Sequence, residues 1–163
     1  MESKKHVLSV TVENKSGVLS RVTGLISRRG FNIDSLSVGP TEDPTMSRIT
    51  AIVNADEMGY EQITKQLHKL ISVFKITDLT NDGAIERELV LYKVNAAPDR
   101  RSEIIEIVNI FRANIVDVGK SSLTIEATGS EDKLKGLEDL LRAYGIKETV
   151  RTGKIAMSRN SRE

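Results

Sequence analysis

The fold is decided by residues 6–38, which read HVLSVTVENKSGVLSRVTGLISRRGFNIDSLSV. Residues 6–13 alternate apolar and polar side chains, and this period of two predicts a half-buried strand. Its apolar members are Leu8, Val10 and Val12. Over residues 18–30 the apolar positions recur at helical spacing and end in Arg-Arg-Gly, which predicts an amphipathic helix. Residues 31–38 then form a second predicted strand.

The rest of the chain continues this alternation of strands and helices. After a turn-rich loop at residues 39–44, the pattern predicts a strand at 46–54, a helix capped by Asp56 and a strand at 73–79. Beyond the polar turn at residues 80–83 the same order returns. The elements predicted there are strands at 87–95, 114–118, 122–128 and 146–151 and helices opening at Pro98 and Ser130.

The predicted order is βαββαβ twice, and short segments of the two halves correspond. Asn32-Ile33 and Asn114-Ile115 each begin a short strand, and these strands end in Val38-Gly39 and Val118-Gly119. A βαββαβ unit forms a four-stranded antiparallel sheet with two helices on one face, which is the ferredoxin-like arrangement. We therefore predict an α+β protein of two ferredoxin-like units in tandem.

The polar turn at residues 80–83 is the predicted linker, so the two domains are expected at residues 1–80 and 85–163. Each unit would leave one sheet face and two sheet edges uncovered. Pairing with a second copy would cover them, and we expect a homodimer. Residues 153–163 are basic and polar and are expected to fray.

Composition excludes several classes of protein. The 24 lysines and arginines balance 23 aspartates and glutamates, and a net charge of +1 gives no overall field to hold a nucleic acid. Without cysteine the chain has no disulfide, zinc-finger site or thiol nucleophile. No apolar run reaches the roughly 18–20 residues that span a bilayer. Residues 1–5 do not resemble a signal peptide, so we expect a cytoplasmic protein without a membrane partner.

The sequence shows no convergent set of titratable side chains that would predict a catalytic or metal site. No serine lies in a recognisable motif with a histidine, and the carboxylates are spread over predicted helix surfaces. The segment 118–121, VGKS, lacks the upstream glycine and the following helix of a phosphate-binding loop. His6 and His68 are interpreted as surface or boundary residues rather than acid–base catalysts. The chain is therefore predicted not to be an enzyme.

The most informative segment is the strand–helix junction at residues 13–19, ENKSGVL. A helix N-terminus presents unpaired backbone N–H groups and a partial positive charge, so a carboxylate can bind there. Gly17 would let a ligand approach the backbone, and the amide of Asn14 could hold an ammonium or a carboxylate group. The alternative is purely local: Ser16 caps the helix and Gly17 only eases the turn.

Residues 14–22 and 30–48 resemble an ACT domain, and more closely the family of small regulatory subunits of acetolactate synthase (acetohydroxyacid synthase). The resemblance extends over nearly the whole chain and includes QITKQLHKL at 62–70 and ERE at 86–88. It implies an N-terminal ACT domain that binds an effector and a C-terminal ACT-like domain. The loop 96–99, AAPD, lacks the Asn-x-x-Gly pattern of the first half, which argues against a second equivalent effector site.

The resemblance also implies a function in valine, leucine and isoleucine biosynthesis. Such small subunits are not catalytic. They bind a large catalytic subunit that carries thiamine diphosphate, Mg²⁺ and FAD, raise its activity and confer feedback inhibition by valine. This chain is thus expected to hold no cofactor itself and to bind a branched-chain amino acid, valine, at an interface between two ACT domains.

The resemblance further implies that two protomers share each valine site. The implied residues are, from one protomer, Asn14, Gly17, Val18 and Leu19 and, from its neighbour, Asn32, Ile33 and Val38. Backbone N–H groups near the glycine would take the carboxylate, the asparagines would take the polar ends, and the apolar side chains of the second group would enclose the isopropyl group. Core packing is the alternative role for Ile33, and a turn position is the alternative for Asn32.

Three other functions are alternatives to this one. A stand-alone ACT-type sensor would bind an amino acid and act on a different partner. An RNA-binding βαββαβ protein would need exposed aromatic and basic residues on its central strands, where this chain has Ser, Thr and Val. A small enzyme on the same fold would need the titratable cluster that the sequence lacks.

Overall fold

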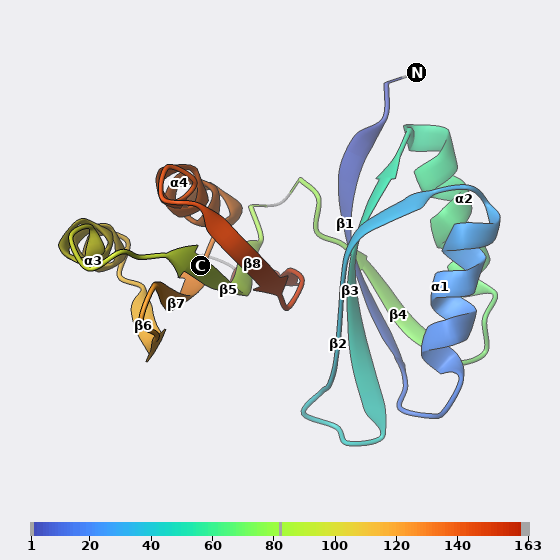
Figure 1. The fold of residues 1–163 in the computed structure, drawn as a ribbon. Coiled ribbons are helices and arrows are strands. Elements are labelled where there is room, and N and C mark those ends of the chain that lie inside the picture. The colour runs from blue at the N-terminus through green and yellow to red at the C-terminus, as the bar shows by residue number, and fades with distance from the viewer. Residues whose placement is uncertain (1, 82, 161–163) are drawn as a thin grey trace. The chain divides into compact units, whose positions relative to one another are not determined.

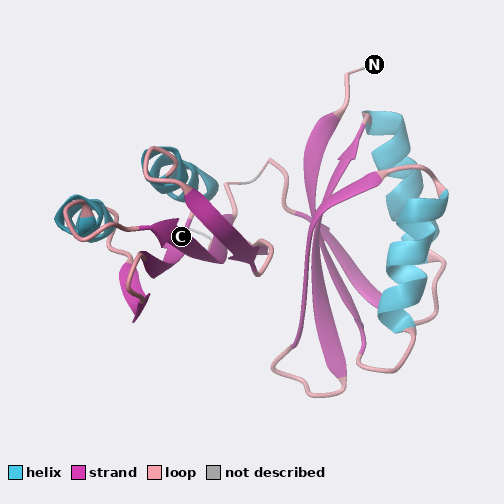
Figure 2. Ribbon diagram, in the orientation of Figure 1, coloured by secondary structure: helices cyan, strands magenta, loops and turns pink. Residues whose placement is uncertain are grey.

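The computed structural model describes residues 2–81 and 83–160 of the 163-residue chain. The chain forms two compact units (Figure 1). The N-terminal unit comprises Met1–Ile85 together with Lys154–Glu163, and the C-terminal unit comprises Glu86–Gly153. Each unit is a sheet with two helices (Figure 2).

The N-terminal unit has the predicted βαββαβ order. Its elements are β1 (Lys4–Glu13), α1 (Val18–Arg28), β2 (Asn32–Pro40), β3 (Met46–Ala55), α2 (Glu57–His68) and β4 (Val73–Asp78). The strands form an antiparallel sheet in the order β2-β3-β1-β4, and both helices cover the same face of it (Figure 1). Strand β2 is therefore an edge strand.

The C-terminal unit repeats this order. Its elements are β5 (Ile85–Asn95), α3 (Arg101–Ile110), β6 (Asn114–Val118), β7 (Ser122–Gly129), α4 (Glu131–Leu141) and β8 (Ile146–Arg151). The sheet order is β6-β7-β5-β8, which corresponds strand for strand to the N-terminal unit. The predicted α+β class with two ferredoxin-like units in tandem is confirmed.

The core of the N-terminal unit follows the period of two in β1. Leu8, Val10 and Val12 are all buried against the helices, as predicted from their alternation. The interpretation of His6 as a surface or boundary residue is wrong. Because β1 begins already at Lys4, His6 shares the helix-facing side, where its ring stacks on Tyr60 with ring centroids 3.9 Å apart. Its Nε2 lies 3.1 Å from the carbonyl oxygen of Ala55.

The segment after β8 returns to the N-terminal unit. Residues Ile155–Met157 form the short strand β9, and Ala156 is buried in a cluster with Val7, Ile52 and Leu79. The backbone N–H of Lys154 donates to Ser35 Oγ at 2.8 Å. The expected fraying of residues 153–163 is therefore wrong for 154–157, because burial of apolar surface orders them. Residues 161–163 lie outside the described residues.

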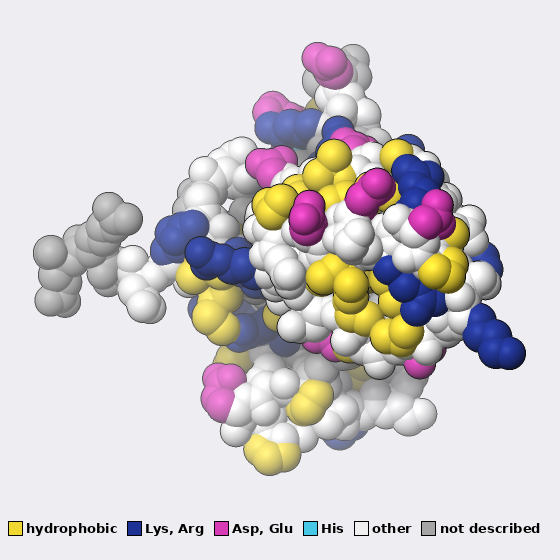
Figure 3. Space-filling view, turned by 60° about the vertical axis from the view of Figure 1, so that its left-hand side comes forward, with side chains coloured by type: hydrophobic (Ala, Val, Ile, Leu, Met, Phe, Trp, Pro, Cys, Tyr) yellow, Lys and Arg dark blue, Asp and Glu magenta, His cyan; other side chains and the backbone are white. Residues whose placement is uncertain are grey.

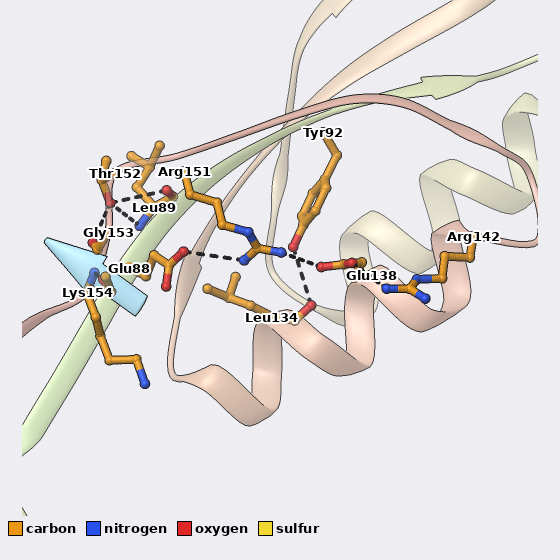
Figure 4. A network of polar contacts seen from close by, with 11 residues as sticks. Glu88, Leu89, Tyr92, Leu134, Glu138, Arg142, Arg151, Thr152, Gly153 and Lys154 are labelled. Carbon is orange, nitrogen blue, oxygen red and sulfur yellow. Dashed lines mark hydrogen bonds and ion pairs between the residues drawn. The ribbon is translucent and has the colours of Figure 1, made fainter. Parts of the chain in front are cut away.

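A network of charges ties three elements of the C-terminal unit together (Figure 4). Arg151 on β8 pairs with Glu138 on α4 at 2.5 Å and with Glu88 on β5 at 3.3 Å. Glu138 also pairs with Arg142 at 2.8 Å. The hydrogen bond from Arg142, joined by that from Arg151, lowers the pKa of Glu138. The network holds α4 against the sheet, so its role is structural.

We predict opposite effects of Gly→Ala substitution in the two helices of the N-terminal unit. A Cβ on Gly59 of α2 would overlap the ring of Phe31 and lie 2.9 Å from Asp56 Oδ1. Gly59→Ala should therefore lower the free energy of unfolding by about 1–2 kcal/mol, since overpacking outweighs the helix propensity of alanine. A Cβ on Gly24 of α1 would meet nothing within 4 Å, so Gly24→Ala should raise it by about 0.5–1 kcal/mol. Urea unfolding measures both, and equal responses would contradict the packing described.

We also predict that Glu138→Gln lowers the free energy of unfolding at neutral pH by about 1 kcal/mol, because both partners of Glu138 are partly exposed. The folded pKa of Glu138 is lowered, so its stabilisation is complete above the unfolded pKa of about 4.3 and is lost as pH falls through the folded pKa. The difference in the free energy of unfolding between wild type and variant, measured by chemical unfolding, should therefore disappear in that acidic range. Glu106→Gln, on the exposed side of α3, is the matched control. If the difference in the free energy of unfolding does not change with pH, the ion pairs of Glu138 are not its cause.

Candidate functional site

The junction between β1 and α1 leaves the N-terminus of the helix open. Gly17 is the N-cap residue, with φ at +84°, a backbone conformation that costs a residue with a Cβ about 1–2 kcal/mol. No side chain of a described residue caps α1. The local alternative, in which Ser16 caps the helix, is therefore wrong, because the chain enters the helix through Gly17 instead. A Cβ on Gly17 would meet nothing within 4 Å, so the space beside its Cα is open.

The first turn of α1 also lacks an acidic residue. Two other helices have both features. Helix α2 has Asp56 as its cap and Glu57 in its first turn. Helix α4 has Ser130 as its cap, followed by Glu131 and Asp132. The partial positive charge at the start of α1 is thus compensated neither by a side-chain cap nor by a carboxylate in the first turn. An anion is the ligand that this helix end favours.

Asn14 is held by the hairpin loop between β2 and β3. Its backbone N–H donates to the carbonyl oxygen of Thr45 at 2.8 Å, and its side-chain Nδ2 donates to that of Pro44 at 3.1 Å. The loop itself is fixed by Asp43, whose pKa is lowered by hydrogen bonds from the Thr45 hydroxyl and backbone N–H. These loop contacts were not predicted from the sequence, where only the prolines marked the segment as a loop.

The remaining junction residues differ in what they can offer to a ligand. The side chain of Val18 is buried in the core, so only its backbone N–H faces the junction. That N–H donates a long hydrogen bond, of 3.4 Å, to the carbonyl oxygen of Lys15. Leu19 is 39% exposed and presents apolar surface. The structure thus brings Asn14, Gly17, Leu19 and the backbone of Val18 together at one end of the sheet.

The other three implied residues lie on β2. Asn32 is exposed at the start of the strand and donates from Nδ2 to Asp34 Oδ1 at 2.5 Å. Ile33 packs partly against the core, and Val38 is 47% exposed. Core packing, the alternative role for Ile33, is therefore present in the structure.

A single chain does not bring the two groups together. Asn32 pairs with Asn54, whereas Glu13, just before the junction, pairs with Met46 at the other end of β3. The strand between Met46 and Asn54 spans roughly 26 Å at about 3.3 Å per residue. Asn32 and Gly17 are thus at opposite ends of the sheet, and joining them into one site requires a second copy of the chain.

Membrane spans, metal sites and basic surfaces can each be checked in the part of the chain that the structure describes. None of their helices is long and apolar enough to cross a membrane. No group of three or more His, Asp or Glu side chains among them could hold a metal ion. On the face drawn in Figure 3, charges of both signs are interspersed with apolar side chains, so this face offers no continuous basic surface for RNA.

Two family models match the chain. Residues 8–75 match an AHAS small subunit-like ACT domain, and residues 87–160 match the small subunit of acetolactate synthase. A probable acetolactate synthase small subunit of Archaeoglobus fulgidus is 54% identical over 159 residues, covering 98% of this chain and 99% of the relative. The acetolactate synthase small subunit of Mycobacterium bovis is 51% identical over 162 residues, covering 99% and 96%.

A solved structure is similar over the same extent. The crystal structure of the acetolactate synthase small subunit from Thermotoga maritima is 40% identical, with a TM-score of 0.87, and the match covers 97% of this chain and 99% of that one.

Proposed function

Because this chain belongs to the family of acetolactate synthase small subunits, we propose that it activates a catalytic large subunit and makes that enzyme sensitive to feedback inhibition by valine. In this proposal catalysis, thiamine diphosphate, Mg²⁺ and FAD all belong to the large subunit. The observation that carries the valine site is the uncapped N-terminus of α1. It lacks both a capping side chain and an acidic residue.

The carboxylate of valine is matched to this helix end. Backbone N–H groups at the start of a helix point toward the ligand, and the helix dipole favours its negative charge. The open space in front of Gly17 admits the ligand to the backbone. Asn14 is held close by through its bond to Pro44, and its side-chain oxygen accepts no hydrogen bond from a described residue, so it can accept one from the ammonium group.

In a two-fold symmetric dimer, strand β2 of the second copy supplies the other half of the proposed site. It is an edge strand, and its outer edge pairs with no described strand, so it can pair with β2 of a second copy. Antiparallel pairing would lay the start of one β2, at Asn32, beside the end of the other, at Pro40. Pro40 pairs with Ser47, at the end of the sheet that carries the α1 junction. Asn32 of the second copy would thus approach Gly17 of the first.

The exposed apolar side chains near this interface match the remaining part of valine. Leu19 and Val38 are both exposed in the single chain, and Ile33 is only partly buried. Covering them with a second copy and with the isopropyl group would remove apolar surface from water, which stabilises the complex. The homodimer and the valine site are therefore one proposal.

Inhibition would follow from a shift between two arrangements of the dimer. Valine that touches both copies binds tightly only when they have one relative arrangement, and it therefore selects that arrangement. A coupling of about 1–3 kcal/mol is typical for such effects and corresponds to roughly 5–150-fold. The selected arrangement would hold the large subunit in a less active form.

We predict that Gly17→Asp abolishes valine inhibition of the reconstituted enzyme and spares its activation. The new carboxylate would occupy the helix end and repel that of valine. Acetolactate formation by the large subunit, assayed with and without this chain over a valine titration, measures both properties. Gly17→Asn is the matched control, because it has the same size and tolerates a positive φ but adds no charge. It should weaken inhibition less than aspartate does.

Two outcomes would count against the proposal in different ways. A Gly17→Asp enzyme that remains fully valine-sensitive means that the effector does not bind at this helix end. A wild-type chain that binds valine in calorimetry but leaves the large subunit unaffected means that it is an amino-acid sensor for a different partner.

A further inference from the structure

The sheet of the N-terminal unit has a second face, turned away from α1 and α2. Val7 and Ile52 make one part of this face apolar, and the part that follows along β1 is polar. On this face, Ser9 of β1 lies opposite Thr50 of β3 and Thr77 of β4. Thr11 of β1 lies opposite Arg48 of β3 and Lys75 of β4. Hydroxyl groups and two cations thus stand where the opposite face carries valine, leucine and isoleucine. Ser9 and Thr50 are buried although they are polar.

A hollow of about 290 Å³ lies on this polar face. Its floor is formed by strands β1, β3 and β4, and one wall is formed by residues 156–158 of the returning C-terminal segment. That wall is anchored by the buried Ala156 and by the bond from Lys154 N–H to Ser35. The hollow therefore has a built boundary on the side where the sheet would otherwise be open.

Arg48 is the unusual residue in this hollow. Its Nε is buried and has no hydrogen-bond partner in the described part of the chain. A buried donor on a charged group that lacks a partner is costly, so a ligand that accepts from it is favoured. Lys75 lines the same hollow and forms no ion pair with a described residue. Glu42 is the one carboxylate among the lining residues, which leaves two cations against one anion.

We propose that this hollow binds a small oxyanion, a phosphate or carboxylate group, through Arg48 and Lys75. The guanidinium donates from Nε and from its terminal nitrogens. This geometry suits two oxygen atoms bound to the same phosphorus or carbon atom. The ammonium of Lys75 supplies a second charge, and the hydroxyls of Ser9, Thr11 and Thr77 supply neutral donors. The hollow shares no residue with the proposed valine site, so this inference goes beyond the proposed function.

The test is calorimetric titration of the full chain at low ionic strength with inorganic phosphate and, separately, with acetate. We expect saturable binding of at least one of them and at least a tenfold loss of affinity in Arg48→Gln. Because Arg48 Nε bonds to no described residue, this variant should have an unfolding midpoint no lower than that of the wild type. Lys65→Gln removes the same charge from the exposed side of α2 and should bind as wild type does.

Hydrogen exchange gives an independent readout. The bound anion should slow exchange at residues 156–158, which form the wall, and leave the α1 junction unchanged. Binding of phosphate alone or acetate alone identifies the source of the oxyanion and supports the proposal. Binding of neither anion, or an equal loss of affinity in Arg48→Gln and Lys65→Gln, would overturn it. Valine inhibition in the Arg48→Gln enzyme should persist, which keeps this test separate from that of the valine site.

Discussion

The start of α1, which has neither a capping side chain nor an acidic residue in its first turn, is the feature on which the proposed function depends. A helix end normally gains a cap or an acidic residue, and α2 and α4 have both. Helix α1 has neither, yet it is held in place because Val18, Val22 and Ile26 are buried beneath it. Tertiary packing thus maintains a helix end whose electrostatics are left for a ligand to satisfy. Gly17 makes this possible, since its positive φ turns the chain into the helix without a side chain over the amides.

The sheet topology explains why one chain alone would not suffice. The register of β2 and β1 on β3 sets the start of β2 and the α1 junction at opposite ends of the sheet. The position of β2 at the sheet edge makes a symmetric partner the simplest way to bring them together. A ligand bound across such an interface senses the arrangement of two copies, which is what a regulatory subunit needs in order to pass a signal to a partner.

The sequence predicted the features that depend on local patterns and missed those that depend on tertiary contacts. The alternation in β1 and the helical stripes determined the order of elements, because each pattern reflects one buried face. The sequence leaves the cap of α1 open, since the choice between Ser16 and Gly17 depends on a backbone angle that no pattern reports. His6 was misjudged because β1 begins earlier than its apolar residues do. Residues 154–157, KIAM, return to pack against the N-terminal unit, whose strands lie far away in sequence, and so short a segment has no periodicity that would predict this. The seven implied site residues came from resemblance and stay a prediction, although the structure separates them into the two groups that a shared site requires.

The most direct test is a mixed dimer, purified with two affinity tags, in which one copy carries Gly17→Asp and the other Asn32→Ala. If each valine lies between the junction of one copy and β2 of the other, both changes fall in one site and the second site stays intact. Calorimetry should then find one valine bound per dimer with wild-type affinity, while each variant homodimer binds weakly or not at all. A mixed dimer that binds valine no better than the two homodimers would show that both residues act within one chain, and the shared site would be wrong.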